Sequence, residues 1–584
     1  MIKNLIFEFY NYIFFYAKIN NILTALFKKK KIKKYSSFFY EIKKVNKYFE
    51  ESEKKVIFES KIKLNEKFHL NIFNEKYNFS KTNLFNLKNK FYDNEILFYI
   101  LRFNWLHFDN NHLSKKQKID LIIYFANNFD INKSDTYSVS ERISNWILFL
   151  KANENNISSN ILLVIKQSID KQIYYLIKNL EFHNKKTNNH LLSNNKSLFL
   201  YSTYYNITKY DNLSLKIFDF LTDHIFFRSG FLNEGSSHYH LLIAKHCIEI
   251  LYFNKLNKKL KPSHEKFFLK VISNIHIFTI NEDLVNFGDS TPDLPIKYLR
   301  FLPYISYKLF GINYPLVYQN DNLDRSCYSS VYNLGPLKKS KLKEKNYSFF
   351  DKESGHLVVK YNSLLFYSLL SNSNIIKPRS HRHTDIGNFI IYYKDKPIFI
   401  DLGRLNYNKK SILNIGASYH NSFKLNNLEP LLCHKLNSIP SLMHKNYFQQ
   451  KPKYYLNIGK NKAKVIFQFF GYKRFPFKSK IIREINIFSN EIEIIDVIKS
   501  KKTTNYQSFF HTALNVEKIN NNHYNLKQKE KILCEFSKID EDSIINTFIS
   551  KCSNEYGLLK SAHSIKVSKK LKKQDKIKYK IKFK

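Results

Sequence analysis

The 584-residue chain is long enough for more than one hydrophobic core, because single cores rarely grow beyond about 250–300 residues. Its 43% hydrophobic and 25% charged residues are typical of globular proteins and exclude a chain that is disordered throughout. The formal net charge of +46 suits a polyanionic partner such as an acidic glycan, a nucleic acid or a membrane surface. The lysines are spread over nearly every segment, so a general bias in composition is the alternative explanation.

Two classes of protein are disfavoured. The five cysteines are dispersed and include no Cys-x-x-Cys pair, which argues against a disulfide scaffold and fits a reducing compartment. The chain has neither the Cys/His spacing of a zinc finger nor the aromatic strand motif of an RNA-binding domain. We therefore expect no nucleic-acid partner despite the charge.

Residues 1–85 are expected to form a helical, basic segment. Residues 1–26 are apolar and aromatic, but polar residues interrupt them and no small-residue cleavage site follows. This makes a poor signal peptide and a segment too polar for a membrane span. A core-packing helix with a solvated basic end, Lys28–Lys34, is the favoured interpretation, and contact with an anionic membrane surface is the alternative. The compartment stays open between the cytoplasm and a periplasmic or membrane-associated location.

Residues 86–335 are expected to form an all-helical domain. Apolar residues recur there at spacings of three and four, which places them on one face of a helix. The clearest stripe runs Ile161, Leu162, Ile165, Ile169, Ile173, Leu176, Ile177 and Leu180. Loops rich in Asn, Ser and Lys separate such stripes, with no strand pattern between them.

Residues 340–584 follow a strand pattern instead. Short β-branched and aromatic runs alternate with polar turns, as on either side of residues 394–397, and this predicts an antiparallel sandwich. Helices followed by strands predict two separately built domains, with a boundary near residues 325–345. The Lys-rich end, Val567–Lys584, is expected to be either an edge strand or a frayed basic tail.

The run His381-Arg382-His383-Thr384-Asp385 is the strongest chemical signal in the chain. An apolar hairpin follows it and ends at Asp401, and His420 is the next candidate ligand. Imidazole and carboxylate groups at this spacing can converge on one cation, with a coordination position left for water or substrate. In a strand, however, His381 and His383 would share one face. A pair of surface histidines without a metal is the alternative.

Seven short segments, in order along the chain, resemble the heparinase II/III-like polysaccharide lyases. They are Ser140–Trp146, Asn189–Asn194, Asn233–His240, Ser354–His356, Pro378–Asp385, Phe399–Gly403 and Tyr419–Ser422. The chain departs from the family pattern at Ser380, where Gly is usual, and after His420, but neither departure removes a functional group. The resemblance implies an α+β multidomain protein: an incomplete α/α toroid, alginate-lyase-like, over residues 86–335, followed by an antiparallel β-sandwich over residues 340–584.

The same resemblance implies cleavage of a uronic-acid glycan by β-elimination. A base removes the C5 proton and the C4 oxygen leaves, so the enzyme must neutralise the adjacent carboxylate. Asn189 is expected to donate to that carboxylate. Tyr239 is expected to transfer protons, as a phenol whose pKa falls in a cationic pocket, with His381 and His190 as partners. Read alone, Asn189 would be a helix cap and Tyr239 a core aromatic.

Further expectations concern substrate binding and metal. Side chains expected to bind substrate are Arg142, Asn145, Asn194, Glu234 and His240, of which Arg142 could instead be a buried structural partner. The expected ligands of a site-supporting Zn²⁺ are His383, Asp401 and His420.

The predicted function is therefore that of a polysaccharide lyase with an anionic polysaccharide substrate. The alternative is a non-catalytic protein on the same fold that binds acidic glycans or assists polysaccharide assembly. The high charge and the absence of a convincing export signal favour this alternative.

Overall fold

The structure is a computed structural model. It describes residues 67–584 except for gaps at 87–90, 92, 108–112, 184–186, 281–282, 315–330, 333, 335–345, 371–380, 409–410, 412–413, 431–451, 471, 473–478, 502 and 541. The expectations for residues 1–66, including the membrane contact, lie outside the described residues. Among the helices that the structure describes, none combines the length and the apolar character that a membrane span requires.

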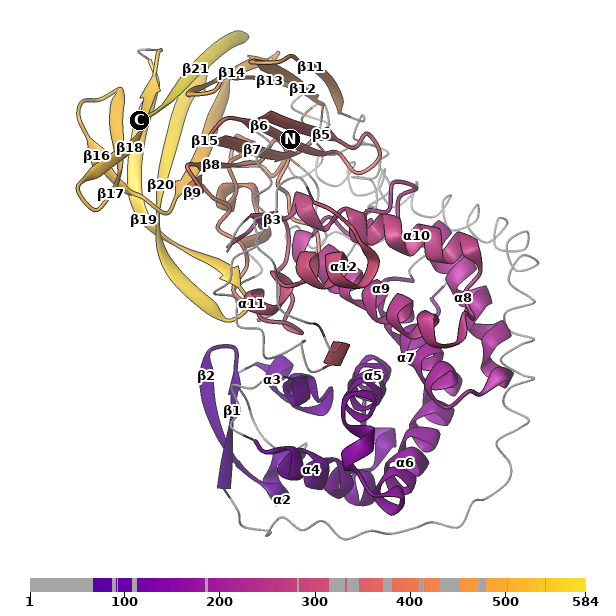
Figure 1. The fold of residues 1–584 in the computed structure, drawn as a ribbon. Helices are drawn as coiled ribbons and strands as arrows, with labels where there is room; N and C mark the ends of the chain where they lie inside the picture. The colour runs from indigo at the N-terminus through magenta and orange to yellow at the C-terminus, as the bar shows by residue number, and fades with distance from the viewer. Residues whose placement is uncertain are drawn as a thin grey trace, which may run out of the picture.

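The first half of the described chain is helical. Its helices are α2 (Lys81–Leu84), α3 (Asn94–Leu101), α4 (Lys115–Asn128), α5 (Thr136–Asn153), α6 (Ser159–Lys178), α7 (Asn189–Tyr204), α8 (Asp211–His224), α9 (Ser237–Asn257), α10 (Pro262–Ser273), α11 (Ile296–Leu299) and α12 (Leu302–Phe310). Figure 1 shows them curving around an open ring. The predicted stripe lies on α6, where Ile165, Ile169 and Ile173 are fully buried. The expected incomplete toroid is confirmed.

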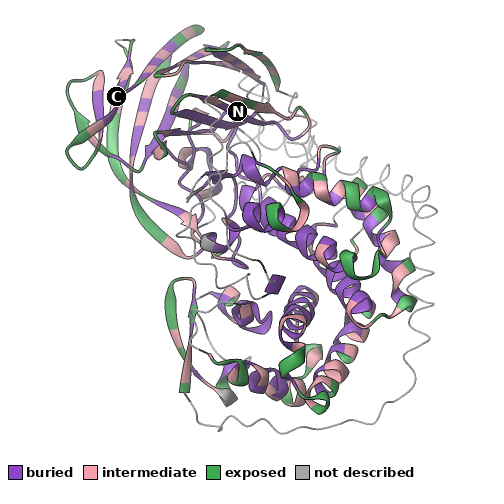
Figure 2. Ribbon diagram, viewed as in Figure 1, coloured by how far each residue is buried: buried purple, intermediate pink, exposed green. Residues whose placement is uncertain are grey.

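Three helices, α5, α7 and α9, form the inner layer of the ring and are buried along most of their length (Figure 2). A buried charge cluster ties them together. Lys196 of α7 pairs with Glu141 of α5 at 3.0 Å and with Glu249 of α9 at 3.1 Å. A lysine tolerates complete burial only with such partners, so these pairs fix how the three helices sit against one another. The N-terminal ends of α7 and α9 carry four of the expected site residues: Asn189, His190, Tyr239 and His240.

The second half is built from antiparallel strands, and within the described residues they form three large sheets. The five-stranded sheet is β5 (Asn346–Phe350), β6 (His356–Tyr361), β7 (Leu364–Leu369), β8 (Phe389–Tyr393) and β9 (Lys396–Phe399). The four-stranded sheet runs β10 (Phe423–Leu425), β15 (Thr504–Thr512), β20 (Leu558–Leu571) and β19 (Ile544–Glu555). The eight-stranded sheet runs β11 (Lys453–Ile458), β12 (Ala463–Phe469), β13 (Lys480–Ile487), β14 (Glu491–Lys499), β21 (Gln574–Phe583), β18 (Lys531–Lys538), β17 (His523–Gln528) and β16 (Asn515–Lys518). The expected antiparallel β-sandwich is confirmed.

The five-stranded sheet joins the two halves of the molecule. Val358 and Tyr367 on one face belong to the core of the helical half, whereas Val359 and Phe366 on the other face belong to the core of the sandwich. A strand buried on both faces has no polar side to alternate with its apolar one. This explains why β6, β7 and β8 read as continuous apolar runs in the sequence.

Two local expectations were wrong. Residues 67–80 form a β-hairpin, β1 (Lys67–Ile72) with β2 (Glu75–Ser80), inside the N-terminal segment that we expected to be helical. The Lys-rich C-terminus is neither an edge strand nor a frayed tail, because β21 lies between β14 and β18. Its Ile577 and Ile581 are fully buried on one face, while Lys578 and Lys580 on the other face pair with glutamates of β14.

Candidate functional site

Three separate segments meet where the helical half faces the sandwich. Asn189 is the first residue of α7, Tyr239 lies in the first turn of α9, and His381 lies in a loop ahead of β8. The His-x-His run is therefore not in a strand. Both imidazoles still point at one carboxylate, Asp289, with His381 Nδ1 at 3.3 Å and His383 Nε2 at 2.9 Å from its oxygens.

Helix caps place two of these side chains. The side chain of Asn188 accepts a hydrogen bond from the His190 amide at 3.1 Å, so Asn188 is the cap of α7. The alternative reading of Asn189 as the cap was wrong. Ser236 caps α9: its hydroxyl accepts from the Tyr239 amide at 3.1 Å and donates to the Asp289 carbonyl at 2.7 Å. The two caps thus hold the site residues at the start of their helices.

A close backbone approach brings Asp289 to the histidine loop. The amide of Asp289 donates to the carbonyl of His381 at 2.9 Å. At the preceding residue, Gly288, φ is +72° and a Cβ would lie 2.5 Å from that carbonyl oxygen. A side chain at this position would push the two segments apart, so Gly288 permits the contact between Asp289 and the histidine loop.

Tyr239 is held between an imidazole and a second phenol. Its ring stacks on His381 with centroids 3.4 Å apart and planes 12° apart. Its hydroxyl lies 2.6 Å from that of Tyr407, which also donates to the Ser290 carbonyl at 3.4 Å. Tyr407 comes from the segment after β9, and the sequence analysis did not identify it. Asp401 and the run that follows it were the only nearby signal.

The electrostatic expectation for Tyr239 was wrong. Burial raises its pKa well above the ordinary value, and the Asp293 carboxylate raises it further, while the hydrogen bond with Tyr407 acts in the opposite direction. The surroundings of the phenol are thus apolar and acidic instead of cationic. The Tyr239 phenol is protonated at neutral pH and is equipped to donate a proton.

Glu234 connects Asn189 to His381. One of its carboxylate oxygens accepts from the backbone amide of Asn189 at 3.2 Å, and the other lies 3.6 Å from His381 Nε2. The side-chain oxygen of Asn189 is buried without a hydrogen-bond partner among the described residues. The carboxamide of Asn189 is therefore not fully engaged by its local surroundings.

His190 lies beside this group. Its Nδ1 is 2.9 Å from Glu181 and its ring packs on Tyr137 with centroids 4.5 Å apart. Burial lowers the pKa of His190, but the hydrogen bond and charge of Glu181, together with the charge of Glu234, raise it, and the pKa is raised overall. The expected set of Asn189, His190, Tyr239 and His381 thus lies in one region of the structure, although its catalytic role stays a prediction.

Asp289 is the central acid of the site, and the sequence analysis missed it. Its carboxylate contacts His381, His383 and the Arg404 guanidinium, whose Nη1 is 3.3 Å away. Burial alone would raise the pKa of Asp289, but the hydrogen bonds from the two imidazoles and the Arg404 charge hold it far below its usual range. The Gly288-Asp289-Ser290 run in an otherwise helical region was the available signal.

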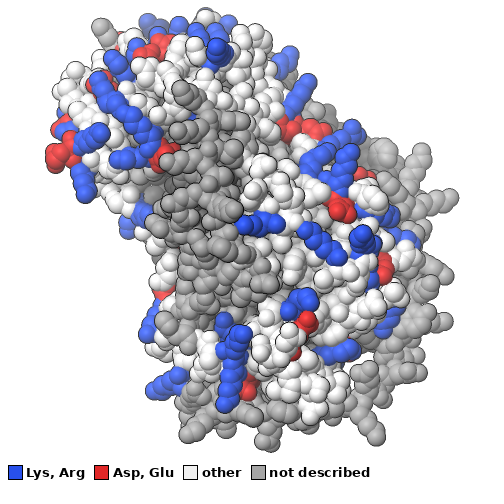
Figure 3. Space-filling model, in the orientation of Figure 1, with Lys and Arg blue, Asp and Glu red and all other residues white. Residues whose placement is uncertain are grey.

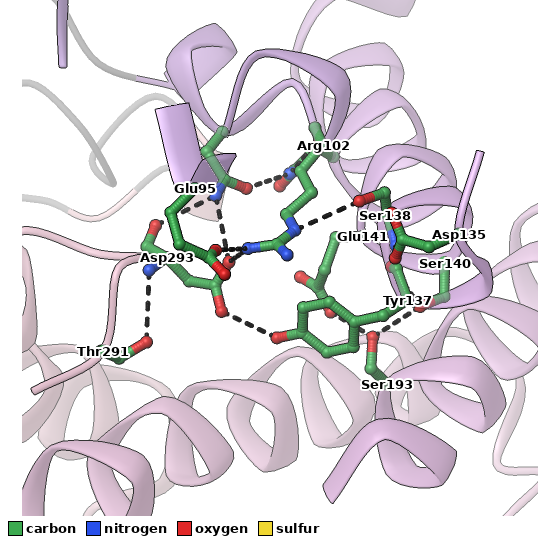
Figure 4. Close-up of polar contacts among 12 residues, drawn as sticks. Glu95, Arg102, Asp135, Tyr137, Ser138, Ser140, Glu141, Ser193, Thr291 and Asp293 are labelled. Atoms are coloured by element: carbon green, nitrogen blue, oxygen red, sulfur yellow. Dashed lines mark hydrogen bonds and ion pairs between the residues drawn. The ribbon is translucent and has the colours of Figure 1, made fainter. Parts of the chain in front are cut away.

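A second buried acid, Asp293, is the centre of a neighbouring group of polar contacts, which is shown in Figure 4. It accepts from Arg102 at 2.7 Å and from the Tyr137 hydroxyl at 2.9 Å, and Arg102 also contacts Glu95 at 3.2 Å. The Tyr137 ring also packs against the His190 ring. Glu95 and Arg102 both belong to the α3 region, seven residues apart, whereas Tyr137 and Asp293 come from distant parts of the chain, so no motif in the sequence marks the group.

Several of the expected substrate-binding side chains contact other parts of the protein instead. Arg142 is fully buried, donates to Gln172 at 2.7 Å and packs on Phe125, so it is the structural partner that the alternative reading described. Asn145 donates to the Arg102 carbonyl, and the Asn194 side chain accepts from the Glu181 amide. His240 is buried against Phe231 and Phe278, and burial lowers its pKa to about 3. Of the five, Glu234 is the one whose side chain, among the described contacts, reaches the catalytic candidates Asn189 and His381.

The expected metal ligands lie next to one another. His420 Nδ1 is 2.7 Å from an Asp401 oxygen, and the His383 and His420 rings are 5.1 Å apart. His383 Nδ1 and His420 Nε2 are buried without hydrogen-bond partners in the described part of the chain. However, Asp401 already accepts from Asn388 and Gly403, and no set of three or more His, Cys, Asp or Glu among the described residues is arranged to hold a metal. The donor types fit zinc, and the metal stays a prediction.

Comparisons with known proteins agree with this architecture. Residues 346–580 match the heparinase II/III-like C-terminal family. The solved structure of heparinase III is similar over 94% of this chain and 90% of its own, with a TM-score of 0.64 and 14% identity. A mutant of heparan sulfate lyase from Pedobacter heparinus is similar over 87% of this chain and 79% of its own, with a TM-score of 0.59 and 14% identity.

A more distant similarity is to chondroitin AC lyase from Streptomyces coelicolor, over 84% of this chain and 74% of its own, with a TM-score of 0.50 and 6% identity. No curated protein matches by sequence. The resemblance to the heparinase II/III-like proteins is confirmed: residues 346–580 form a heparinase II/III-like C-terminal domain, and the chain as a whole has the fold of heparinase III.

Proposed function

We propose that the protein is a polysaccharide lyase that cleaves an acidic, uronic-acid-containing glycan by β-elimination. The observation that carries the proposal is the meeting of Tyr239, His381 and Asn189 from three separate segments, linked through Glu234 and Asp289. The proteins of this fold named above include a heparan sulfate lyase and a chondroitin AC lyase, and their names support the same class of substrate.

The site residues can be assigned to the steps of the reaction. The side-chain amide of Asn189 would donate to the substrate carboxylate and so lower the cost of forming the carbanion at C5. The Nδ1–H of His381 would donate a hydrogen bond to Asp289. The lone pair of this tautomer lies on Nε2, which would accept the C5 proton. The electron pair of the C–H bond then forms the C4–C5 double bond as the C4–O bond breaks. The Tyr239 phenol, protonated at rest, would give its proton to the leaving oxygen.

The charge of the chain supports an anionic partner. Figure 3 shows Lys and Arg spread over the displayed face of both halves, with acidic side chains among them. Such a surface attracts a polyanion without fixing where it binds. Recognition of the cleaved bond therefore rests on the buried polar groups of the site.

The test is incubation of purified protein with alginate, glycosaminoglycans and a bacterial surface polysaccharide, followed by near-ultraviolet absorbance of the unsaturated ends. We expect product from at least one of them. Asn189→Ala is expected to lower kcat by about 10²- to 10³-fold, the usual loss when one donor to a developing negative charge is removed. No product from any of these glycans would rule out the lyase.

A matched control is Asn195→Ala, which removes a fully buried side-chain amide of the same helix that donates to the Ser214 carbonyl, away from the proposed catalytic residues. This control variant is expected to lower the free energy of unfolding and to leave kcat near that of the parent. Glycan binding that persists in Asn189→Ala while the parent makes no product would instead support the non-catalytic binding protein.

We also propose that Zn²⁺ binds at His383, Asp401 and His420 and supports the site. The unpaired nitrogens His383 Nδ1 and His420 Nε2 would bind the cation, and the Asp401 carboxylate would leave its contact with His420 Nδ1 to join them. The three residues come from separate loops, so the ion would hold the loop that carries His381 against the sandwich. Asp289 contacts both His381 and His383. It would orient the His383 ring toward the ion without binding the ion itself.

The metal is tested by elemental analysis of protein purified without chelator. About one equivalent of zinc is expected, as in other sites with imidazole and carboxylate ligands, and His383→Ala is expected to lose it. Chelation should lower the unfolding temperature of the parent, because an ion that binds only the folded state stabilises it. A metal-free parent whose unfolding temperature does not respond to added zinc would rule out the site.

A further inference from the structure

The β19–β20 hairpin reaches from the sandwich to the opening of the helical ring. Figure 1 shows the two strands, in yellow, sweeping down until their turn lies near α11 and the β1–β2 hairpin. The turn holds Tyr556 and Gly557, between Glu555 of β19 and Leu558 of β20. None of the proposed reaction steps requires a hairpin of this length. The contacts of the β19–β20 hairpin therefore indicate its role.

Tyr556 at the turn touches both halves of the molecule. Its hydroxyl donates to Asp93, the N-cap of α3, at 2.8 Å and accepts from the backbone amide of Tyr407 at 3.1 Å. Its ring packs on Phe73 of the β1–β2 turn, with centroids 5.0 Å apart, and on the Tyr407 ring at 5.3 Å. The side chain is 2% exposed. One buried phenol therefore joins the start of the helical half to the segment after β9.

The backbone of the hairpin forms hydrogen bonds with the segment after β9. The Ser553 amide donates to the Leu402 carbonyl and the Gly557 amide to the Leu405 carbonyl, both at 2.8 Å. At Gly403, where φ is +63°, a Cβ would lie 2.1 Å from the Ser553 carbonyl oxygen. Only glycine allows this approach. The chain from residue 402 to residue 407 is thus laid along the hairpin by main-chain hydrogen bonds and ends at the Tyr556 hydroxyl.

This segment leads directly into the site. Its last residue, Tyr407, places its hydroxyl 2.6 Å from that of Tyr239. The contact from Asp93 to Tyr239 therefore passes through Tyr556 and Tyr407 in turn. A small shift of Tyr407 would move a hydrogen-bond partner of the group that must deliver a proton. Displacements of about 1 Å at a reacting group can cost about 10²-fold in rate.

We infer that Tyr556 is a positioning residue, which fastens the β19–β20 hairpin to Asp93 and thereby sets Tyr407 against Tyr239. The inference rests on the proposed lyase function for its effect on rate, but not for its effect on the segment from residue 402 to residue 407. It makes the C-terminal hairpin part of the site, although its tip touches none of the proposed reacting groups.

The test is Tyr556→Phe, which keeps the ring contacts and removes both hydrogen bonds. We expect kcat to fall about 10- to 100-fold with KM nearly unchanged, the pattern of a disturbed transition state with intact binding. Hydrogen exchange, followed by mass spectrometry, should be faster in peptides covering residues 402–408. Asp93→Asn, which keeps an oxygen to cap α3, should change both measurements in the same direction and by less.

Tyr361→Phe is the matched control, because the Tyr361 hydroxyl is also buried but donates to the Gly459 carbonyl within the sandwich. It should leave kcat and the exchange of residues 402–408 as in the parent. Parent-like exchange or parent-like kcat in Tyr556→Phe would each overturn the inference. If the parent cleaves no acidic glycan, the proposed function has failed, and the exchange measurement alone decides whether Tyr556 holds the segment.

Discussion

Replacing Tyr239 by Phe is expected to lower kcat for glycan cleavage by about 10²- to 10⁴-fold, the usual contribution of a positioned acid or base. The change removes one oxygen and keeps the ring that stacks on His381. Because burial raises the pKa of Tyr239, the parent phenol stays protonated through neutral and mildly alkaline pH. Substrate binding should change little, so the loss is expected in kcat and not in KM.

The measurement is initial rate by near-ultraviolet absorbance over a range of glycan concentrations, with the unfolding temperature measured on the same samples. Tyr314→Phe is the control, since its buried hydroxyl donates to the Ile272 carbonyl away from the site. A Tyr239→Phe variant that retains more than about a tenth of the parent kcat would exclude an essential proton transfer by this phenol. Rescue of the rate by external acids would instead support it.

The division into a helical half and a strand half could be predicted because each half keeps its period over many residues. The stripe on α6 and the polar turns of the sandwich need only local rules of spacing. The position of β21 could not be predicted in this way. Its alternating lysines resemble an edge strand, but they pair with Glu491 and Glu493 of β14, and that partner strand is far away in the sequence.

The same limit applies to the site. Asn189, Tyr239 and His381 lie in short runs that resemble a family pattern, so their order along the chain was informative. Asp289, Tyr407 and Tyr556 lie in loops, where no period marks a buried polar side chain. Arg142 shows the converse error, because its run resembles the family although its guanidinium is buried against Gln172 and Phe125. A family pattern cannot distinguish a residue that binds substrate from one that supports the helix carrying it.

The largest effect on stability is expected from Asp289→Asn. This change removes the charge that Arg404, His381 and His383 share and leaves the buried guanidinium without its carboxylate. Breaking one side of a buried ion pair costs about 3–5 kcal/mol, so the free energy of unfolding in urea should fall by about that amount. The kcat should fall as well, because His381 loses the acceptor that orients its ring.

Asp496→Asn separates these two effects. Asp496 forms a buried two-pronged pair with Arg483 in the sandwich, at 2.8 Å and 2.7 Å, and none of its contacts reaches the proposed catalytic residues. It should lower the free energy of unfolding by a similar amount while kcat per folded molecule stays near that of the parent. If Asp289→Asn behaves in the same way, Asp289 only holds the fold together. If it loses kcat at temperatures where both variants are folded, the carboxylate orients His381 for the reaction, because both variants break a buried Arg–Asp pair and only Asp289→Asn also removes a contact with His381.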